Sequence, residues 1–435
     1  MTEKGKEIYE DLKKKIELLK DPDSEYAKFG EIWKLGCLGK YRSFDLRYYY
    51  EDTSREFVER HRESLTKMRE DFVENIEMYV EKCINVMEKA NKFKVYYAKN
   101  NAEAQKIFME ELGDYDVLYK SKSLEAKDIG LMDVLKKNNI QIKETDLGDV
   151  LCQLMDYDHP SFTLGPGIQF TEDEIVKKMK EKLGVEIEPK PEAIVNYFRN
   201  TYRKELLNDV KVSLTSANAI SADDGSIVLI ENEGNISLIT RATEKHIVAV
   251  GIQKIVPTIF DALKVVKIQQ RITNVDAGYI SIITSPSNTS DIRGKKVLGM
   301  YGAKEVVVIL VDDWRTRAVK ENLFYKDILK CIACKSCDFV CTASRAFGNI
   351  YASKYGIGAV NIIRDYIHNG IEAAVKDGLF LCTGCENCKN WCPVNVDIPE
   401  IMRKLKKEAT EKGLSPPPLE AYKNKILEEK NPFKE

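Results

Sequence analysis

Eight of the eleven cysteines in this chain form two runs with one spacing, C-x2-C-x2-C-x3-C, in the last quarter of the sequence. The first run consists of Cys331, Cys334, Cys337 and Cys341, and the second of Cys382, Cys385, Cys388 and Cys392. A [4Fe–4S] core needs four thiolates, and three of them on one tight loop can wrap it while a distant cysteine supplies the fourth. The spacing therefore predicts two [4Fe–4S] clusters, which would carry single electrons.

Each run is expected to lend its last cysteine to the cluster of the other run, as two-cluster proteins of this spacing do. The predicted ligands of one cluster are Cys331, Cys334, Cys337 and Cys392, and those of the other are Cys382, Cys385, Cys388 and Cys341. Zinc fits less well, because zinc sites often combine C-x2-C pairs with histidine and neither run contains one. A disulfide framework fits less well in a large-cored chain that we expect to be cytoplasmic.

No obvious substrate-binding group stands beside the cysteines, so the two clusters are expected to form an electron relay rather than a reaction centre. Cluster potentials span roughly −700 to +450 mV with charge, hydrogen bonding and exposure, and both directions of electron flow stay open.

The remainder of the chain is long enough to bury a large core. Its 435 residues suggest about two to four domains. Lys and Arg number 67 against 69 Asp and Glu, which argues against a nucleic-acid partner, because affinity for phosphates requires an excess of cations. The sequence has no run of about 18 or more apolar residues, so no membrane span is predicted. The first 15 residues are charged throughout and lack the apolar core of a signal peptide, so we expect a cytoplasmic protein.

Four segments are predicted along the chain. They are a helical region at 1–90, an α/β domain at 91–321, a helical two-cluster ferredoxin-like domain at 322–405 and a tail at 406–435. Within the first segment, residues 36–50 are expected to be irregular. Within the tail, three consecutive prolines at 416–418 predict a stiff extended linker.

The second segment alternates short apolar runs with helical patterns, which predicts a largely parallel sheet covered by helices on both faces. The predicted strands are 93–98, 116–119, 140–144, 210–215, 226–230, 236–240, 246–251 and 305–311, and the helices include 101–112, 125–138, 172–183 and 257–271. The turn signals at 224–225 and 233–235 predict antiparallel hairpins between neighbouring strands.

Several polar residues at predicted strand ends are candidates for a small-molecule site, because open α/β sheets bind ligands there. They are Glu231, Asn232, Glu233, Gly234, Asn235 and Arg315, with Arg317 nearby. The alternatives are that the first five only close a hairpin and that the arginines are surface residues. His246 is expected to be a satisfied histidine at a strand edge, with a catalytic base as the alternative.

The second segment also resembles a known family. The segments that carry the resemblance are LTSAN at 214–218, DGSIVLIENEGN at 224–235, HIVAVGIQKIVP at 246–257, KSKS at 120–123, ETDLG at 144–148 and SIIT at 281–284. They resemble the LUD domain of lactate-utilisation proteins, and a two-cluster module fused to that domain is similar to the iron–sulfur, B-type members of the family.

The resemblance implies a three-layer α/β domain similar to the ribose-phosphate isomerase and CoA-transferase group. It also implies membership of a complex that oxidises L-lactate to pyruvate. The expected partners are a cysteine-rich subunit resembling those of heterodisulfide reductase and a second LUD protein. Any flavin would be carried by a partner.

Three functions are compatible with these observations. The first is an electron-transfer subunit of a complex that oxidises a 2-hydroxy acid. The second is an enzyme whose LUD-like pocket binds a small acid or a CoA-type ligand and exchanges electrons with it. The third is a docking scaffold with a chemically inert middle domain.

Overall fold

The structure is a computed structural model that describes residues 2–46, 48–49, 51–157, 160–162, 165–273 and 278–430. Its contacts divide the chain into two units. The sheet unit comprises residues 44–158 and 165–334, and the helical unit comprises residues 1–43, 159–164 and 335–435. The expected helical region at 1–90 is thus shared between the two units. Within the described residues, no helix is both long and apolar enough to cross a bilayer.

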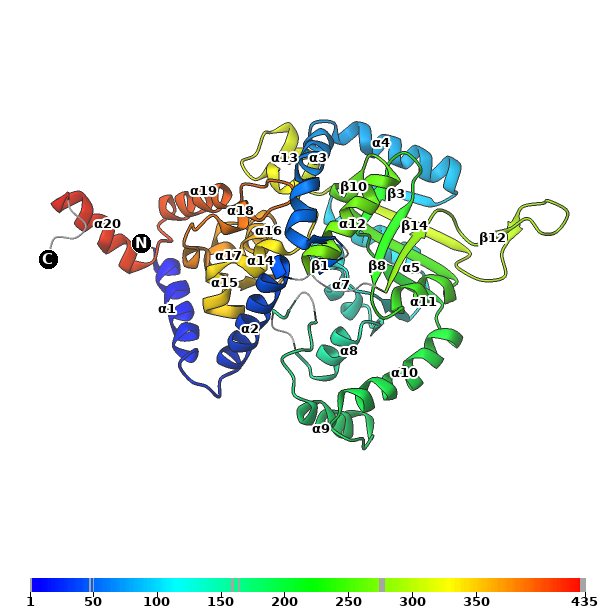
Figure 1. The fold of residues 1–435 in the computed structure, drawn as a ribbon, viewed down its shortest axis with the longest axis horizontal. Helices are drawn as coiled ribbons and strands as arrows, with labels where there is room; N and C mark the ends of the chain where they lie inside the picture. The colour runs from blue at the N-terminus through cyan, green and yellow to red at the C-terminus, as the bar shows by residue number, and fades with distance from the viewer. Residues whose placement is uncertain are drawn as a thin grey trace. The chain divides into compact units, whose positions relative to one another are not determined.

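A six-stranded, wholly parallel sheet forms the core of the sheet unit (Figure 1). Its strands, in spatial order, are β3 (Lys94–Ala98), β14 (Glu305–Val311), β9 (Lys245–Gly251), β6 (Val212–Thr215), β4 (Val117–Lys120) and β5 (Gln141–Glu144). These six strands confirm the corresponding predictions. Along the chain, β4 leads outward to β5, whereas β6 leads to β9 and β14 on the other side. The strand order therefore reverses between β4 and β6, which is where such sheets commonly bind ligands.

Both faces of this sheet are buried, as expected for a three-layer α/β domain. Ile247, Ala249 and Val307 point to one face, where they pack with residues of α5 (Asn101–Leu112), α6 (Leu124–Asp128) and α7 (Leu131–Lys137). The alternate side chains Val248 and Val308 point to the opposite face and are also fully buried. A continuous apolar run without alternation is typical of parallel strands covered on both sides.

The other helices of the sheet unit surround these layers. They are α3 (Ser54–Glu74), α4 (Ile76–Val86), α8 (Leu147–Leu154), α9 (Glu172–Leu183), α10 (Pro191–Asn208), α12 (Ile259–Thr273) and α13 (Arg315–Lys320). The helix expected at 125–138 is divided into α6 and α7 at Gly130, which has a φ of 67° that ends one helix before the next begins. A short hairpin of β12 (Asn288–Thr289) and β13 (Val297–Leu298) extends away from the sheet (Figure 1).

A second sheet of four strands carries one of the two expected hairpins. Its order is β10 (Ile255–Val256), β7 (Ala219–Ser221), β8 (Ile227–Glu231) and β11 (Tyr279–Ile283). The turn at 224–225 joins β7 to the antiparallel strand β8, as predicted.

The predicted hairpin at 233–235 is wrong, and so is the strand at 236–240. This segment leads from β8 into the helix α11 (Asn235–Ala242). The β-branched residues of the segment favour a strand locally. However, the Glu231 carboxylate accepts a hydrogen bond from the Ser237 N–H at 2.9 Å, which supplies an acceptor for the first turn of a helix. Tertiary placement of Glu231 therefore overrides the local preference.

Two predictions in the helical unit are also wrong. Much of the segment expected to be irregular is helical, because α2 runs from Glu25 to Leu46 despite three glycines. Phe29, Trp33 and Cys37 repeat at helical spacing and are buried in one cluster with Phe162 and Phe339, so packing compensates for the low helix propensity of glycine. The other residues of the expected irregular segment include 47 and 50, which lie outside the described residues.

The expected extended tail is helical as well. Helix α19 (Ile398–Glu411) crosses the expected boundary at 405, and α20 spans Pro417–Glu429. A proline in the first turn of a helix loses no hydrogen bond, because the N–H groups there have no partner within the helix. The proline run therefore starts α20, and residues 431–435 of the tail lie outside the described residues.

Candidate functional site

The two cysteine runs have the same backbone conformation. Ala333 and Lys335 have φ angles of 57° and 67°, and their equivalents 51 residues later, Gly384 and Glu386, have 70° and 62°. Short helices then follow in each run, α14 (Ser336–Val340) and α18 (Asn387–Asn390). Non-glycine residues seldom adopt positive φ. The repeat in the sequence is therefore also a repeat of the backbone turn around the second cysteine of each run.

The helical unit brings the last cysteine of the first run to the second run. Burial, together with the neighbouring sulfurs of Cys341, Cys382 and Cys385, raises the pKa of the Cys388 thiol to about 12. The Thr342 hydroxyl, next to Cys341, lies 3.1 Å from that of Thr383 and 3.5 Å from the Cys385 sulfur. Cys341 is therefore a neighbour of the three sulfurs of the second run, and the cross-ligation stays a prediction.

The surroundings of these four sulfurs fit an iron–sulfur cluster. The Ser344 N–H lies 3.5 Å from the Cys341 sulfur at the start of α15 (Thr342–Phe347), and the Asn387 N–H and the Thr342 hydroxyl lower the pKa of Cys385 against its burial. Cluster potentials depend on such hydrogen bonds to sulfur. When bound, a [4Fe–4S] cluster would supply one-electron transfer at this place.

The other four cysteines are divided between the two units. Cys331 and Cys334 are among the last residues of the sheet unit. There the Ala333 N–H lies 3.3 Å from the Cys331 sulfur. Cys337 and Cys392 belong to the helical unit, where the Val396 N–H lies 3.3 Å from the Cys392 sulfur. Each pair thus has at least one N–H donor close to a cysteine sulfur, as a cluster ligand uses.

The two loops differ in exposure despite their common shape. Cys334 in the first loop is only 7% exposed, whereas its equivalent Cys385 is an exposed residue. The loop positions on either side, 383–386, are exposed as well. The second loop is therefore the more accessible of the two to another molecule.

Arg69 of α3 supports the segment that precedes the first run, and the sequence carried no signal for this role. Its guanidinium is 1% exposed and donates to the Gln253, Ile255 and Leu329 carbonyls at 2.7, 2.8 and 2.7 Å. A fourth bond, of 3.3 Å, reaches the carbonyl of Lys330, directly before Cys331. Burial lowers the pKa of Arg69 to about 10, which still leaves it charged at neutral pH.

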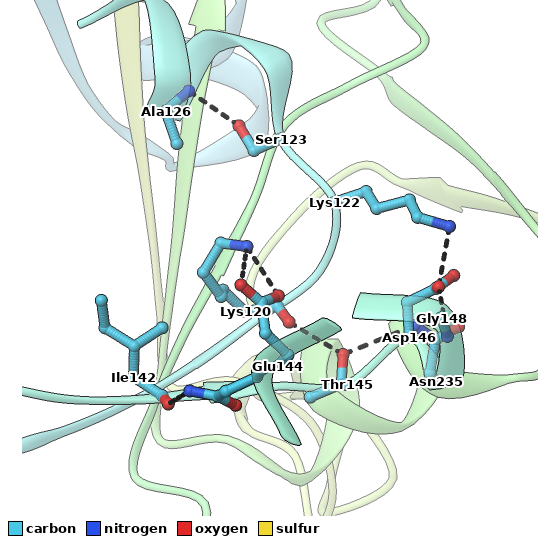
Figure 2. A network of polar contacts seen from close by, with 11 residues as sticks. Lys120, Lys122, Ser123, Ala126, Ile142, Glu144, Thr145, Asp146, Gly148 and Asn235 are labelled. Atoms are coloured by element: carbon cyan, nitrogen blue, oxygen red, sulfur yellow. Dashed lines mark hydrogen bonds and ion pairs between the residues drawn. The ribbon is translucent and has the colours of Figure 1, made fainter. Parts of the chain in front are cut away.

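A polar network occupies the carboxyl ends of β4 and β5, close to the point where the strand order reverses (Figure 2). The Lys120 ammonium binds both oxygens of Glu144 at 2.8 and 2.7 Å, and Lys122 pairs with Asp146 at 2.7 Å. Asp146 also begins α8, because its carboxylate accepts a bond from the Gly148 N–H. The two lysines are therefore neutralised by the last residue of β5 and by the loop that follows it.

Two further groups in this region have buried polar atoms without a partner among the described residues. They are the Ser121 hydroxyl and one carboxylate oxygen of Asp149. Burial raises the pKa of Asp149 to about 6, and Glu144 and Asp146 raise it while the two lysines lower it. The network therefore contains a carboxyl group that titrates near neutral pH.

The five residues at 231–235 lie at the end of β8 and the start of α11, and two of them approach this network. The Asn235 amide lies 3.4 Å from the Thr145 hydroxyl, as Figure 2 shows, and the Leu147 N–H donates to Glu233 at 3.3 Å. Glu231 is 6% exposed and accepts bonds from Ser237, so it stabilises α11. Asn232 and Glu233 are exposed, and Gly234 has a φ of 81°.

Arg315 lies elsewhere, after β14, and is not a surface residue. It is 1% exposed, and its guanidinium pairs with Glu125 at 2.9 Å and lies 3.9 Å from Asp128. Two further bonds reach the carbonyls of Val311 and Asp312. These internal partners occupy the N–H groups of the Arg315 guanidinium with which a carboxylate ligand would bind.

His246 lies in a central strand rather than at an edge, since β9 has β14 on one side and β6 on the other. It is fully buried, and one ring nitrogen lies 2.8 Å from the Thr215 hydroxyl. Burial lowers its pKa to about 3. The imidazole is therefore neutral at physiological pH, which suits a structural histidine.

We expect His246 to make the protein less stable in mild acid. Between pH 6.5, the ordinary pKa, and about 3, the unfolded chain binds a proton that the folded chain excludes. Folding stability should therefore fall with pH below 6.5, by about 2 kcal/mol at pH 5. Urea unfolding at several pH values should show a shallower pH dependence for His246→Gln. The control, His368→Gln at a half-buried helical position, should retain the dependence of the wild type.

Two family models match the chain. A model described as LUD domain matches residues 80–311, more than half of the chain, and a model described as 4Fe-4S dicluster domain matches residues 327–396. The second match contains both cysteine runs.

Among curated proteins, the chain is similar to the uncharacterized electron transport protein YkgF of Escherichia coli. The two are 27% identical over 363 residues, which cover 81% of this chain and 72% of that protein. It is similar to lactate utilization protein B of Bacillus subtilis, with 27% identity over 351 residues, 80% of this chain and 70% of the relative. Lactate utilization protein B of Bacillus licheniformis is 28% identical over 357 residues, with 80% and 71% covered.

A crystal structure of a DUF162 family protein from Deinococcus radiodurans aligns with 54% of this chain and 97% of its own, with a TM-score of 0.28 and 12% identity.

Proposed function

Because the chain belongs to the LUD domain family and carries a 4Fe-4S dicluster domain, we propose that it is the iron–sulfur electron-transfer subunit of a complex that oxidises L-lactate to pyruvate. The observation that carries this proposal is the shared location of Cys341 with Cys382, Cys385 and Cys388. The substrate is proposed from the printed names of the B-type relatives, which are lactate utilization proteins.

The electron count of the reaction agrees with two clusters. Conversion of a 2-hydroxy acid to a 2-oxo acid releases two electrons and two protons, and each cluster accepts one electron. We propose that Cys382, Cys385, Cys388 and Cys341 hold one cluster, and that Cys331, Cys334, Cys337 and Cys392 hold the other. The protons and the carbon chemistry are assigned to the subunit that binds lactate.

The proposed partners are a cysteine-rich subunit of the heterodisulfide-reductase type and a second LUD protein, with any flavin on a partner. The exposed loop around Cys385 supports electron exchange with a partner through the cluster of the second run, because electron transfer requires close approach of the two cofactors. We place this complex in the cytoplasm.

The test is to purify the full chain without oxygen and to analyse its metal. About eight irons per chain are expected, four for each cubane, together with an electron paramagnetic resonance signal on reduction with dithionite. Addition of L-lactate and the co-purified partner subunits should also reduce the clusters. One zinc per cysteine run, with no iron and no visible absorbance, would contradict the proposal.

A further inference from the structure

Tyr351 lies beside the cysteines proposed to hold the cluster of the second run, which we call the second set: Cys341, Cys382, Cys385 and Cys388. It lies in the helical unit between a short helical turn (Gly348–Ile350) and β15 (Ala352–Ser353), and it is 0% exposed. Its N–H donates to the Gly348 carbonyl at 3.3 Å, and its carbonyl accepts a bond from the Gly358 N–H at 3.0 Å. Both peptide groups of the residue are thus anchored, and its ring is fully buried.

The phenol oxygen of Tyr351 is buried and has no hydrogen bond of ordinary geometry among the described residues. Its neighbours are sulfurs. Burial raises the pKa of Tyr351 well above 10.0, and the nearby sulfurs of Cys341, Cys382 and Cys388 raise it further, with Cys382 within hydrogen-bonding reach. The hydroxyl is therefore a buried donor whose proton is available to a sulfur.

A buried hydroxyl without a partner costs about 1–3 kcal/mol, and such groups are rare in folded proteins. A sulfur acceptor with good hydrogen-bond geometry removes this cost. The thiolate and sulfide sulfurs of a cluster bound to these cysteines are such acceptors, and they carry negative charge, which strengthens the bond.

We propose that the Tyr351 hydroxyl donates a hydrogen bond to a sulfur of the cluster held by Cys341, Cys382, Cys385 and Cys388 and thereby raises the reduction potential of that cluster. This inference rests on the proposed function, because it requires the cluster. The reduced cluster carries one more negative charge than the oxidised cluster, so a donor stabilises the reduced form more. No proton moves; the cluster gains or loses one electron while the hydroxyl remains protonated.

The effect should be confined to one cluster, because the sulfurs around Tyr351 all belong to the second set. A difference between the two potentials gives the relay a direction. Tyr351 would therefore help to decide which of the two clusters holds an electron in the partly reduced protein.

The test is a redox titration of the full-length Tyr351→Phe protein, followed by electron paramagnetic resonance. The substitution removes only the hydroxyl and keeps the ring. One midpoint potential should become more negative by about 59 mV, which for a one-electron couple is a tenfold lower ratio of reduced to oxidised clusters at the wild-type midpoint. The matched control is Tyr355→Phe, a buried tyrosine of the same segment that packs against His368 and Arg364. Its two potentials should equal those of the wild type.

A Cys385→Ser protein, which should lack the second cluster, identifies the signal that belongs to it. The wild type should also show an exchangeable proton coupled to that cluster, which is lost in D2O and missing from Tyr351→Phe. If Tyr351→Phe contains about eight irons and neither midpoint moves, the inference is overturned while the proposed function stands. If the wild type contains no iron, the proposed function fails and the inference with it.

Discussion

Replacement of Cys341 by serine should remove the cluster of the second cysteine run and leave the cluster of the first run in place. Iron should fall from about eight to about four per chain. The reason is geometric: Cys341 belongs to the first run by sequence but lies with Cys382, Cys385 and Cys388 in the structure. Serine is a poor substitute for thiolate in an iron–sulfur site.

Comparison of four variants makes this prediction specific. Cys341→Ser and Cys385→Ser should lose the same paramagnetic signal, whereas Cys392→Ser and Cys334→Ser should lose the other. Cys152→Ser is the control, because Cys152 lies outside both runs with its sulfur 3.2 Å from the Pro166 carbonyl oxygen, and it should retain all the iron. Loss of one signal by Cys341→Ser and Cys334→Ser together, with retention by Cys385→Ser, would show that each run binds its own cluster.

Replacement of Arg69 by methionine should destabilise the sheet unit by roughly 3–5 kcal/mol, because buried carbonyl groups lose their donors. Four carbonyls accept bonds from this guanidinium, and two of them, of Leu329 and Lys330, directly precede Cys331. Methionine fills a similar volume, so the loss is electrostatic rather than a cavity. The expected result is a lower urea midpoint and poorer loading of the first run.

The matched control is Arg62→Met on the same helix. Arg62 pairs with Glu59 near the surface, and exposed pairs contribute only about 0–1 kcal/mol. Its urea midpoint and iron content should remain near those of the wild type. Equal midpoints for Arg69→Met and the wild type would show that the four carbonyls are satisfied in another way.

Local patterns in the sequence were sufficient to predict the parallel sheet and the loops of the cysteine repeat. The strands β9 and β14 contain the continuous apolar runs 247–250 and 306–311, and only a strand buried on both faces requires such a run. The spacing within each cysteine run is a few residues, so the loop geometry is contained within the run itself. The positive φ angles of Ala333 and Gly384 agree with this.

Other elements depended on contacts between residues far apart in the chain. Helix α2 forms through the glycines because Trp33 packs against Phe162 and Phe339. Helix α11 forms in a β-branched segment through a nearer contact, because Glu231 at the end of β8 accepts the Ser237 N–H six residues later. Local propensity is a weak prior of at most about 1 kcal/mol per residue for residues other than proline, which one long-range contact can exceed.

By itself, therefore, the sequence determined which atoms are available for electron transfer and how each half of the motif is folded, because both depend on spacing over a few residues. Only the tertiary structure decided that Glu125 neutralises Arg315, that Arg69 supports the segment before Cys331 and that the Tyr351 hydroxyl faces cysteine sulfurs. Each of these pairs is separated by tens to hundreds of residues. Burial and charge pairing are properties of the folded chain, and they have no signature in local spacing.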